Sequence, residues 1–167
     1  GGSRGIGRAV CLQLADMGYS IVINYASNKD AALETKRLVE EKGVEAELLP
    51  FNVTQSAEVE QALDNWKKDH PEDYIAVLVN NAGIRQDAMM LLMQDEQWND
   101  VLNTSLNGFF YVTRKLLKDM LSKRFGRIIN MVSLSGIKGL PGQTNYSAAK
   151  AAVIGATKAL AQEIGAR

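Results

Sequence analysis

Short apolar runs alternate with longer amphipathic stretches along the whole chain. The runs are rich in β-branched residues, as buried strands are, and lie at about 20–24, 47–51, 75–79 and 127–132. Around them, apolar residues recur at helical spacing over about 9–17, 28–42, 54–69, 96–124 and 146–164. This alternation with short connections predicts βαβ units around a doubly wound parallel sheet, an α/β fold with three layers, α/β/α.

The stretch from Glu96 to about Arg124 predicts one long helix whose apolar residues cover more than one stripe. One stripe can face the sheet. The other apolar positions fit two interpretations equally well. Either the helix is simply well buried within the chain, or it also packs against a partner helix from a second subunit.

Composition narrows the class of protein. A chain of 167 residues suits one domain with a sizeable core. Its 19 basic and 19 acidic residues cancel, which gives no electrostatic footprint for nucleic acid or an anionic membrane. No apolar run approaches the roughly 20 residues of a membrane span, and no signal-peptide pattern is present. The one cysteine, Cys11, excludes an internal disulfide and fits a reducing, cytoplasmic compartment.

Histidine content argues against two kinds of catalytic site. His70 is the only histidine and lies in the polar loop His70-Pro71-Glu72-Asp73, where a solvated side chain is expected. A serine-hydrolase triad therefore has no candidate histidine. Without clustered cysteines and histidines, no metal site is expected either.

The chain opens on the glycine-rich segment Gly1-Gly2-Ser3-Arg4-Gly5-Ile6-Gly7, which leads into the first helical stretch. A glycine-rich turn at a helix N-terminus presents backbone N–H groups and the positive end of the helix dipole, which together bind a pyrophosphate. In such a site Gly1 serves the tight turn, Gly5 the close approach of the phosphate, and Gly7 the packing of helix on strand. By itself the segment also fits a flexible terminus.

The segment Asn24-Tyr25-Ala26-Ser27-Asn28 bears on which dinucleotide such a site takes. A site for NAD places an acidic residue here to bind the ribose 2′-hydroxyl. The first acidic residue is Asp30, inside the next helical stretch. A 2′-phosphate is therefore tolerated, which favours NADP over NAD, although the segment also fits an ordinary polar turn. The candidate partners of that phosphate are Arg4, Ser27 and Asn28, with Ala26 beside them.

Small or polar residues gather wherever a predicted strand ends. These clusters are Asn24–Asn28, Asn52-Val53, Asn80-Asn81-Ala82-Gly83 and Ser133-Leu134-Ser135-Gly136. Ligands of open α/β sheets bind at the carboxyl ends of strands, so four clusters on one edge predict a dinucleotide-binding, Rossmann-like domain. The later run Met89 to Met93 is either core filler or the lining of an apolar substrate entrance.

Ser133, Tyr146 and Lys150 form a candidate proton-transfer site. Tyr146 and Lys150 are four residues apart in a helical stretch, so they share one face of that helix. A lysine ammonium beside a tyrosine favours the phenolate, and the Ser133 hydroxyl at a strand end can hold a carbonyl oxygen beside the phenol. Taken alone, a tyrosine and a lysine at this spacing are usually two surface residues.

Together these motifs resemble the short-chain dehydrogenase/reductase family over the whole chain. The matching pieces are residues 1–7, Asn80-Asn81-Ala82-Gly83, Ser133 and Tyr146-Ser147-Ala148-Ala149-Lys150. Within the family the chain looks most like the 3-oxoacyl-[acyl-carrier-protein] reductases. That narrower resemblance rests on segments 3–8, 95–100, 126–130 and 142–146, the last reading Gly142-Gln143-Thr144-Asn145-Tyr146.

The resemblance implies a role for each residue of the site. Tyr146 is the implied general acid that protonates the carbonyl oxygen, Lys150 assists it and binds the nicotinamide ribose, and Ser133 orients the substrate carbonyl. The hydride comes from the nicotinamide C4 of the cofactor, which in these reductases is typically NADPH. The residues implied around its phosphates are Gly1, Ser3, Arg4, Gly5, Ile6 and Gly7. Those implied elsewhere on the cofactor are Asn52 and Val53 near the adenine and Asn81, followed by Ala82 and Gly83, near the ribose.

The chain departs from the family at one site residue. Members carry an asparagine in the long helix that completes a proton relay through water, and the resemblance puts Ser105 at that position. Asn103 and Asn107 are each two residues away, about 200° around a helix, so neither simply replaces that asparagine. We expect a retained but altered relay, in which a water extends the reach of the Ser105 hydroxyl.

The chain also departs from the family at its ends. The family has a first strand, and further strands after the last helix, for which residues 1–167 contain no counterpart. We therefore expect a single NAD(P)-binding Rossmann-like domain truncated at both ends. Unpaired strand edges are costly, so a polypeptide of these residues alone is expected to be poorly stable and inactive.

Three functional hypotheses follow. The leading one is NADPH-dependent reduction of a 3-oxoacyl thioester carried by acyl carrier protein, in fatty acid or related acyl-chain biosynthesis. The enzyme would be a homotetramer or homodimer built on the two long helices. One alternative is a reductase or dehydrogenase of another ketone or secondary alcohol. The other, from a different class, is a dinucleotide-binding sensor without turnover, against which the intact Ser133, Tyr146 and Lys150 argue.

Overall fold

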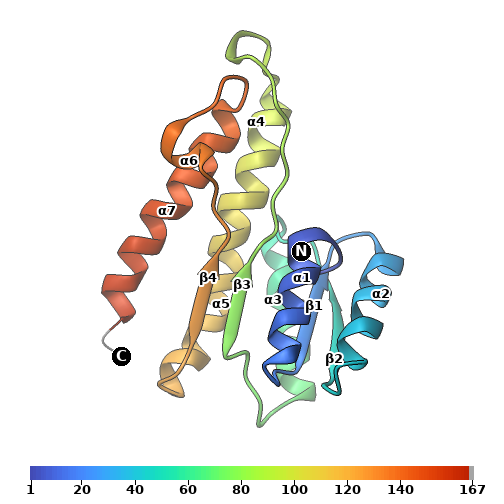
Figure 1. Ribbon diagram of the computed structural model, residues 1–167. Helices are drawn as coiled ribbons and strands as arrows, with labels where there is room; N and C mark the ends of the chain where they lie inside the picture. Colours follow the sequence, from blue (N-terminus) through green and yellow to red (C-terminus); the bar gives the residue numbers. More distant parts are fainter. Residues whose placement is uncertain (166–167) are drawn as a thin grey trace.

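A computed structural model describes residues 1–165 and confirms the alternation of strands and helices (Figure 1). The strands are β1 (Ile21–Tyr25), β2 (Ala46–Pro50), β3 (Val77–Asn80) and β4 (Arg127–Asn130). The helices are α1 (Gly5–Asp16), α2 (Lys29–Glu40), α3 (Ser56–Asp69), α4 (Asp95–Leu102), α5 (Gly108–Ser122), α6 (Ser135–Lys138) and α7 (Thr144–Ile164). A short 3₁₀ turn, Met90–Leu92, precedes α4.

The strands form two parallel pairs. β1 pairs with β2 with Ile21 opposite Ala46, and β3 pairs with β4 with Val77 opposite Arg127. No ladder joins the two pairs within residues 1–165. Instead, Gly1 and Gly2 connect the carboxyl end of β1 with the segment that follows β3. Gly2 N donates to Asn24 O at 2.8 Å, and Asn81 Nδ2 donates to Gly1 O at 2.8 Å.

Apolar cores lie on both faces of these strands, as a three-layer α/β/α arrangement requires. In β2, Leu48 packs with a cluster formed by α1, α2 and β1, whereas Leu49 packs with a cluster formed by α3, α5 and β3. Consecutive strand residues point to opposite faces, so the two clusters lie on opposite sides of the strands. The predicted layering is confirmed.

The predicted single helix over 96–124 is interrupted. Between α4 and α5 the chain takes a π-helical turn, Asn103–Asn107, before the α-helix resumes at Gly108. Such a turn contains one residue more than an α-helical turn, and such turns are frequent at functional sites. Ser105 lies in this turn and is 5% exposed. No helix within residues 1–165 is both long and apolar enough to cross a membrane.

Candidate active site

The glycine-rich segment forms a turn that leaves the start of α1 open. Gly5 has a φ of +54°, a backbone conformation that favours glycine. A Cβ atom on Gly7 would lie 1.9 Å from Gly1 O, so no other residue fits there without moving the turn. The first turn of α1 holds no acidic residue, and Arg4 makes no side-chain cap. The helix N-terminus therefore offers free N–H groups and a positive dipole end to an anion.

The end of β1 carries no carboxylate. The Asn24 side chain donates to Leu49 O and Phe51 O, which ties the end of β1 to the end of β2. Asn28 Oδ1 caps α2 by accepting the N–H of Ala31 at 2.9 Å, so that oxygen is already used. Ser27 and Arg4 stay exposed. A hydroxyl and a guanidinium are donors, which suit a phosphate better than a neutral ribose hydroxyl.

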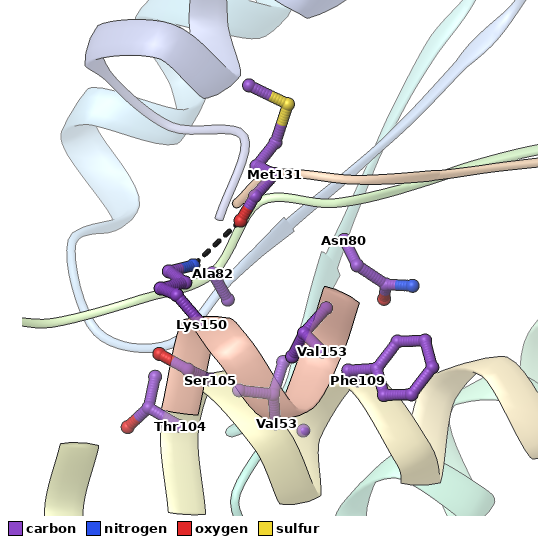
Figure 2. Close-up of a pocket in the computed structure, with 10 residues that line it drawn as sticks. Val53, Asn80, Ala82, Thr104, Ser105, Phe109, Met131, Lys150 and Val153 are labelled. Carbon is purple, nitrogen blue, oxygen red and sulfur yellow. Dashed lines mark hydrogen bonds between the residues drawn. The ribbon is translucent and has the colours of Figure 1, made fainter. Parts of the chain in front are cut away.

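Lys150 is anchored below the ends of β3 and β4. Its side chain is 5% exposed, and Nζ donates to Met131 O at 2.7 Å (Figure 2). Nζ also lies 5.6 Å from the centroid of the Tyr146 ring, so the two residues share one face of α7 as predicted. Burial away from water lowers the pKa of Lys150 below its ordinary value.

A small cavity adjoins the lysine. Its volume is about 20 Å³, and Figure 2 shows Lys150, Ser105 and Asn80 reaching it from α7, the π turn and β3. Ser105 Oγ is buried and has no hydrogen-bond partner. A Cβ atom on Gly83 would lie 3.5 Å from both Lys150 Nζ and Ser105 Oγ, so Gly83 borders both polar groups. Asn103 and Asn107 bind each other instead, because Asn107 Nδ2 donates to Asn103 Oδ1 at 2.7 Å.

Hydrogen bonds to the backbone fix the segments that carry Ser133 and Tyr146. Ser133 Oγ accepts the backbone N–H of Ser135 at 3.2 Å. Asn145, with 0% exposed, accepts the backbone N–H of Tyr146 through Oδ1 at 2.7 Å. Its Nδ2 donates to Gln86 O and Gln97 O, both at 3.0 Å. The first turn of α7 is thereby fixed against α4 and the segment after β3.

The sequence model of the short chain dehydrogenase family matches residues 1–167. The chain belongs to this family. Three curated relatives are named 3-oxoacyl-[acyl-carrier-protein] reductase. Those of Staphylococcus epidermidis and Haemophilus influenzae are each 42% identical over 167 residues, all of this chain and 68% and 66% of the relatives. That of Synechocystis sp. is 44% identical over 171 residues, all of this chain and 67% of the relative.

As a short chain dehydrogenase, the protein is an oxidoreductase that interconverts CH–OH and C=O groups with a nicotinamide dinucleotide. The open N-terminus of α1 and the positive φ of Gly5 fit the pyrophosphate of such a cofactor. Asn52 and Val53 have other contacts in this structure. Asn52 Oδ1 accepts the N–H of Thr54 at 3.1 Å, and Val53 lies against Gly108 and lines the cavity. Their contact with the adenine therefore stays a prediction.

Sequence reasoning missed several residues of this short chain dehydrogenase site. The sequence presents Asn145 and Gln143 only as part of a family motif, and it indicates no role for Asp87 and Ser135. The side chains of Ser135, Gln143 and Asp87 are joined by hydrogen bonds, one of which spans 56 positions of the sequence. The Asn145 side chain donates to the backbone oxygens of Gln86 and Gln97. The available signal is that Gln143 and Asn145 are amides at the start of a helix rich in alanine. Amides that are buried there need partners.

The Met89 to Met93 run had two interpretations, and the core interpretation is wrong for most of it. Met89, Met90 and Leu92 are each more than 60% exposed, and Leu91 is 94% exposed. Exposed apolar side chains also follow Ser133, at Leu134, Ile137 and Leu140. An isolated bridge between Ala88 and Gln143 brings the two segments together. Both lie at the end of the molecule where α4 and α7 begin (Figure 1).

Proposed function

We propose that this protein reduces the 3-oxo group of an acyl thioester to a 3-hydroxyl group, with NADPH as the donor and acyl carrier protein as the carrier of the chain. The observation that carries the proposal is the buried Lys150 ammonium beside the Tyr146 ring, together with its hydrogen bond to Met131 O, two residues before Ser133. The names of the relatives supply the substrate class.

The three side chains divide the work at the carbonyl group. Tyr146 donates its phenolic proton to the carbonyl oxygen, and Ser133 holds that oxygen by donating a hydrogen bond. Lys150 stabilises the phenolate that remains, because its ammonium lies over the Tyr146 ring. When bound, NADPH supplies the hydride that adds to the carbonyl carbon.

The preference for NADPH rests on the end of β1. Arg4 and Ser27 would hold the 2′-phosphate, and no carboxylate between Asn24 and Asn28 opposes it. The remaining cofactor contacts follow the motif. They are Gly1, Ser3, Gly5, Ile6 and Gly7 at the phosphates, Ala26 beside the 2′-phosphate, Asn52 and Val53 at the adenine, and Asn81, Ala82, Gly83, Tyr146 and Lys150 toward the nicotinamide ribose.

We assign Ser105 to a proton relay that restores the Tyr146 proton. Its buried, unpartnered Oγ and the Lys150 Nζ both face a cavity of about 20 Å³. A cavity needs about 10–15 Å³ to hold one water, and a water there has polar partners on two sides. Such a water links Ser105 to Lys150, whereas an asparagine would reach further by itself.

Substrate and subunit contacts complete the proposal. The exposed apolar residues of 89–92 and 134–140 line the path of the acyl chain. A homotetramer or homodimer forms through α5, where Phe110 is 47% exposed, and through the exposed small residues of α7. One cysteine, which allows no internal disulfide, fits a cytoplasmic enzyme.

The test is NADPH consumption with an acetoacetyl thioester. Activity that disappears in Tyr146→Phe supports the proposal. Activity only with other ketones would favour the reductase of another substrate. NADPH binding without turnover on a broad ketone panel would favour a dinucleotide-binding sensor.

A further inference from the structure

The Ser133 hydroxyl begins a chain of hydrogen bonds that ends at an ion pair. Ser133 Oγ donates to Ser135 Oγ at 3.2 Å, and Ser135 Oγ donates to Gln143 Oε1 at 3.0 Å. Gln143 Nε2 donates to Asp87 Oδ2 at 3.0 Å. The same carboxylate oxygen accepts from an Arg85 guanidinium nitrogen at 3.1 Å. Five side chains from three segments are thus connected in series.

The direction of every bond in this chain is fixed from the Asp87 end. A carboxylate has no hydrogen to give, so the amide of Gln143 must turn its NH₂ group toward Asp87 and its oxygen toward Ser135. Ser135 is 6% exposed and has a single hydroxyl hydrogen, which is committed to Gln143. Ser135 therefore cannot donate its hydroxyl to Ser133.

The consequence for Ser133 is that it serves as a hydrogen-bond donor. One lone pair of its Oγ takes the backbone N–H of Ser135, and its own O–H points to Ser135 Oγ. A carbonyl oxygen in the site would attract that O–H away from Ser135. Ser135 would still be satisfied, because it keeps its bond to Gln143.

We infer that Asp87 and Gln143 are positioning residues, which act through Ser135 to fix the place and the donor direction of the Ser133 hydroxyl. The inference rests on the proposed function, because only there does Ser133 hold a substrate carbonyl oxygen. None of the three residues needs to touch the substrate. Their effect on the reaction passes entirely through Ser133.

The segment that carries Asp87 is itself held against the start of α7. Ala88 N donates to Gly142 O at 2.8 Å, on one side of the Asp87–Gln143 contact. On the other side, Asn145 Nδ2 donates to the backbone oxygen that precedes Asp87, at 3.0 Å. Ser133 and Tyr146 are thereby both held by hydrogen bonds to the segment around Asp87. This shared support keeps a constant distance between the two hydroxyl groups that would contact the carbonyl oxygen.

The size of the effect follows from rotamers. Without Gln143, the Ser135 O–H is free to turn toward Ser133, and Ser133 keeps only the backbone N–H of Ser135 as a fixed partner. If all three staggered χ1 wells then become equally populated, about one third of the molecules keep the Ser133 hydroxyl in place. Loss of the chain should therefore lower kcat/KM about threefold, and up to about tenfold if the turn that carries Ser133 also shifts.

The experiment is a double-mutant cycle in the protein that carries this chain, with NADPH and an acetoacetyl thioester. Gln143→Met removes both hydrogen bonds at similar volume. We expect this substitution to lower kcat/KM about three- to tenfold in the otherwise wild-type protein. In a protein that already carries Ser133→Ala, it should cause no further loss. The KM for NADPH should not change. The same substitution at an exposed position of α3, Gln61→Met, should leave the activity at the wild-type level. Equal losses in both backgrounds would overturn the inference.

Two further measurements keep the inference testable. If Gln143→Met does not fold, Ser135→Ala removes the middle hydroxyl and should show the same dependence on Ser133. Crystal structures give a readout that needs no turnover: Ser133 should have one χ1 rotamer in the wild type and several in Gln143→Met. An unchanged single rotamer would contradict the inference. A wild type without activity on the thioester would instead count against the proposed function, and the rotamers would still decide the role of Asp87 and Gln143.

Discussion

Lys150 Nζ lies 2.7 Å from Met131 O, the carbonyl of the residue that follows β4 by one position and precedes Ser133 by two. The contact joins α7 to the segment that follows β4 and carries Ser133. It also removes the ammonium from water, because Lys150 is only 5% exposed. The site therefore carries a charge whose burial costs stability and whose position serves chemistry.

That burial predicts a specific pH dependence of stability. Burial lowers the pKa of Lys150 in the folded protein below the value of 10.5 that it keeps when unfolded. Between these two values the unfolded chain binds more protons, so stability rises with pH up to about 10.5. Lys150→Met should be within about 1 kcal/mol of the wild type at neutral pH and should lack this rise. Urea unfolding at several pH values measures the difference, and equal pH slopes would contradict the prediction.

Gly7→Ala should weaken NADPH binding. The alanine Cβ would lie 1.9 Å from Gly1 O, so the turn at the start of α1 must open. The backbone N–H groups of this turn would then no longer point to one phosphate. We expect at least a tenfold weaker Kd in a fluorescence titration, roughly the loss of one charge-assisted hydrogen bond. Gly43→Ala is the control. Its φ of +82° makes it strained as well, but it lies beyond α2 and should bind NADPH normally. Equal binding by both variants would be inconsistent with the phosphate site.

Ser27→Asp should change the cofactor preference. The new carboxylate would repel a 2′-phosphate and accept a hydrogen bond from a ribose 2′-hydroxyl. The ratio of kcat/KM for NADPH to that for NADH should fall at least about tenfold, which corresponds to about 1.4 kcal/mol of discrimination. Ser27→Thr keeps a hydroxyl and should retain the NADPH preference. A ratio that Ser27→Asp leaves unchanged would place the 2′-phosphate elsewhere.

Ser105→Asn tests the proton relay. The longer amide would enter the cavity of about 20 Å³ and displace the water that we place between Ser105 and Lys150. The pH profile of kcat should therefore shift, while the KM for NADPH stays close to that of the wild type. Ser105→Ala should lower kcat, because the water loses one of its partners. If both profiles match that of the wild type, Ser105 is outside the relay.

The sequence predicted strands, helices and the Tyr146–Lys150 pair because each depends on local spacing. Four-residue spacing puts two side chains on one helix face whatever the helix packs against. The π turn around Ser105 was not predictable in this way, since Asn103-Thr104-Ser105-Leu106-Asn107 carries no local signal for an extra residue. The hydrogen bond between Gln143 and Asp87 joins two segments that are far apart in the sequence, so it could not be predicted without the fold.

We propose that Tyr146, held beside the buried Lys150, protonates a 3-oxoacyl carbonyl during reduction by NADPH. NADPH oxidation with an acetoacetyl thioester tests this step when the wild type of the protein that carries this chain is compared with Tyr146→Phe. We expect turnover by the wild type and a loss of about 10²- to 10⁴-fold in Tyr146→Phe, with NADPH still bound. Turnover that survives in Tyr146→Phe, or a wild type that binds NADPH without consuming it, would rule out this role of Tyr146.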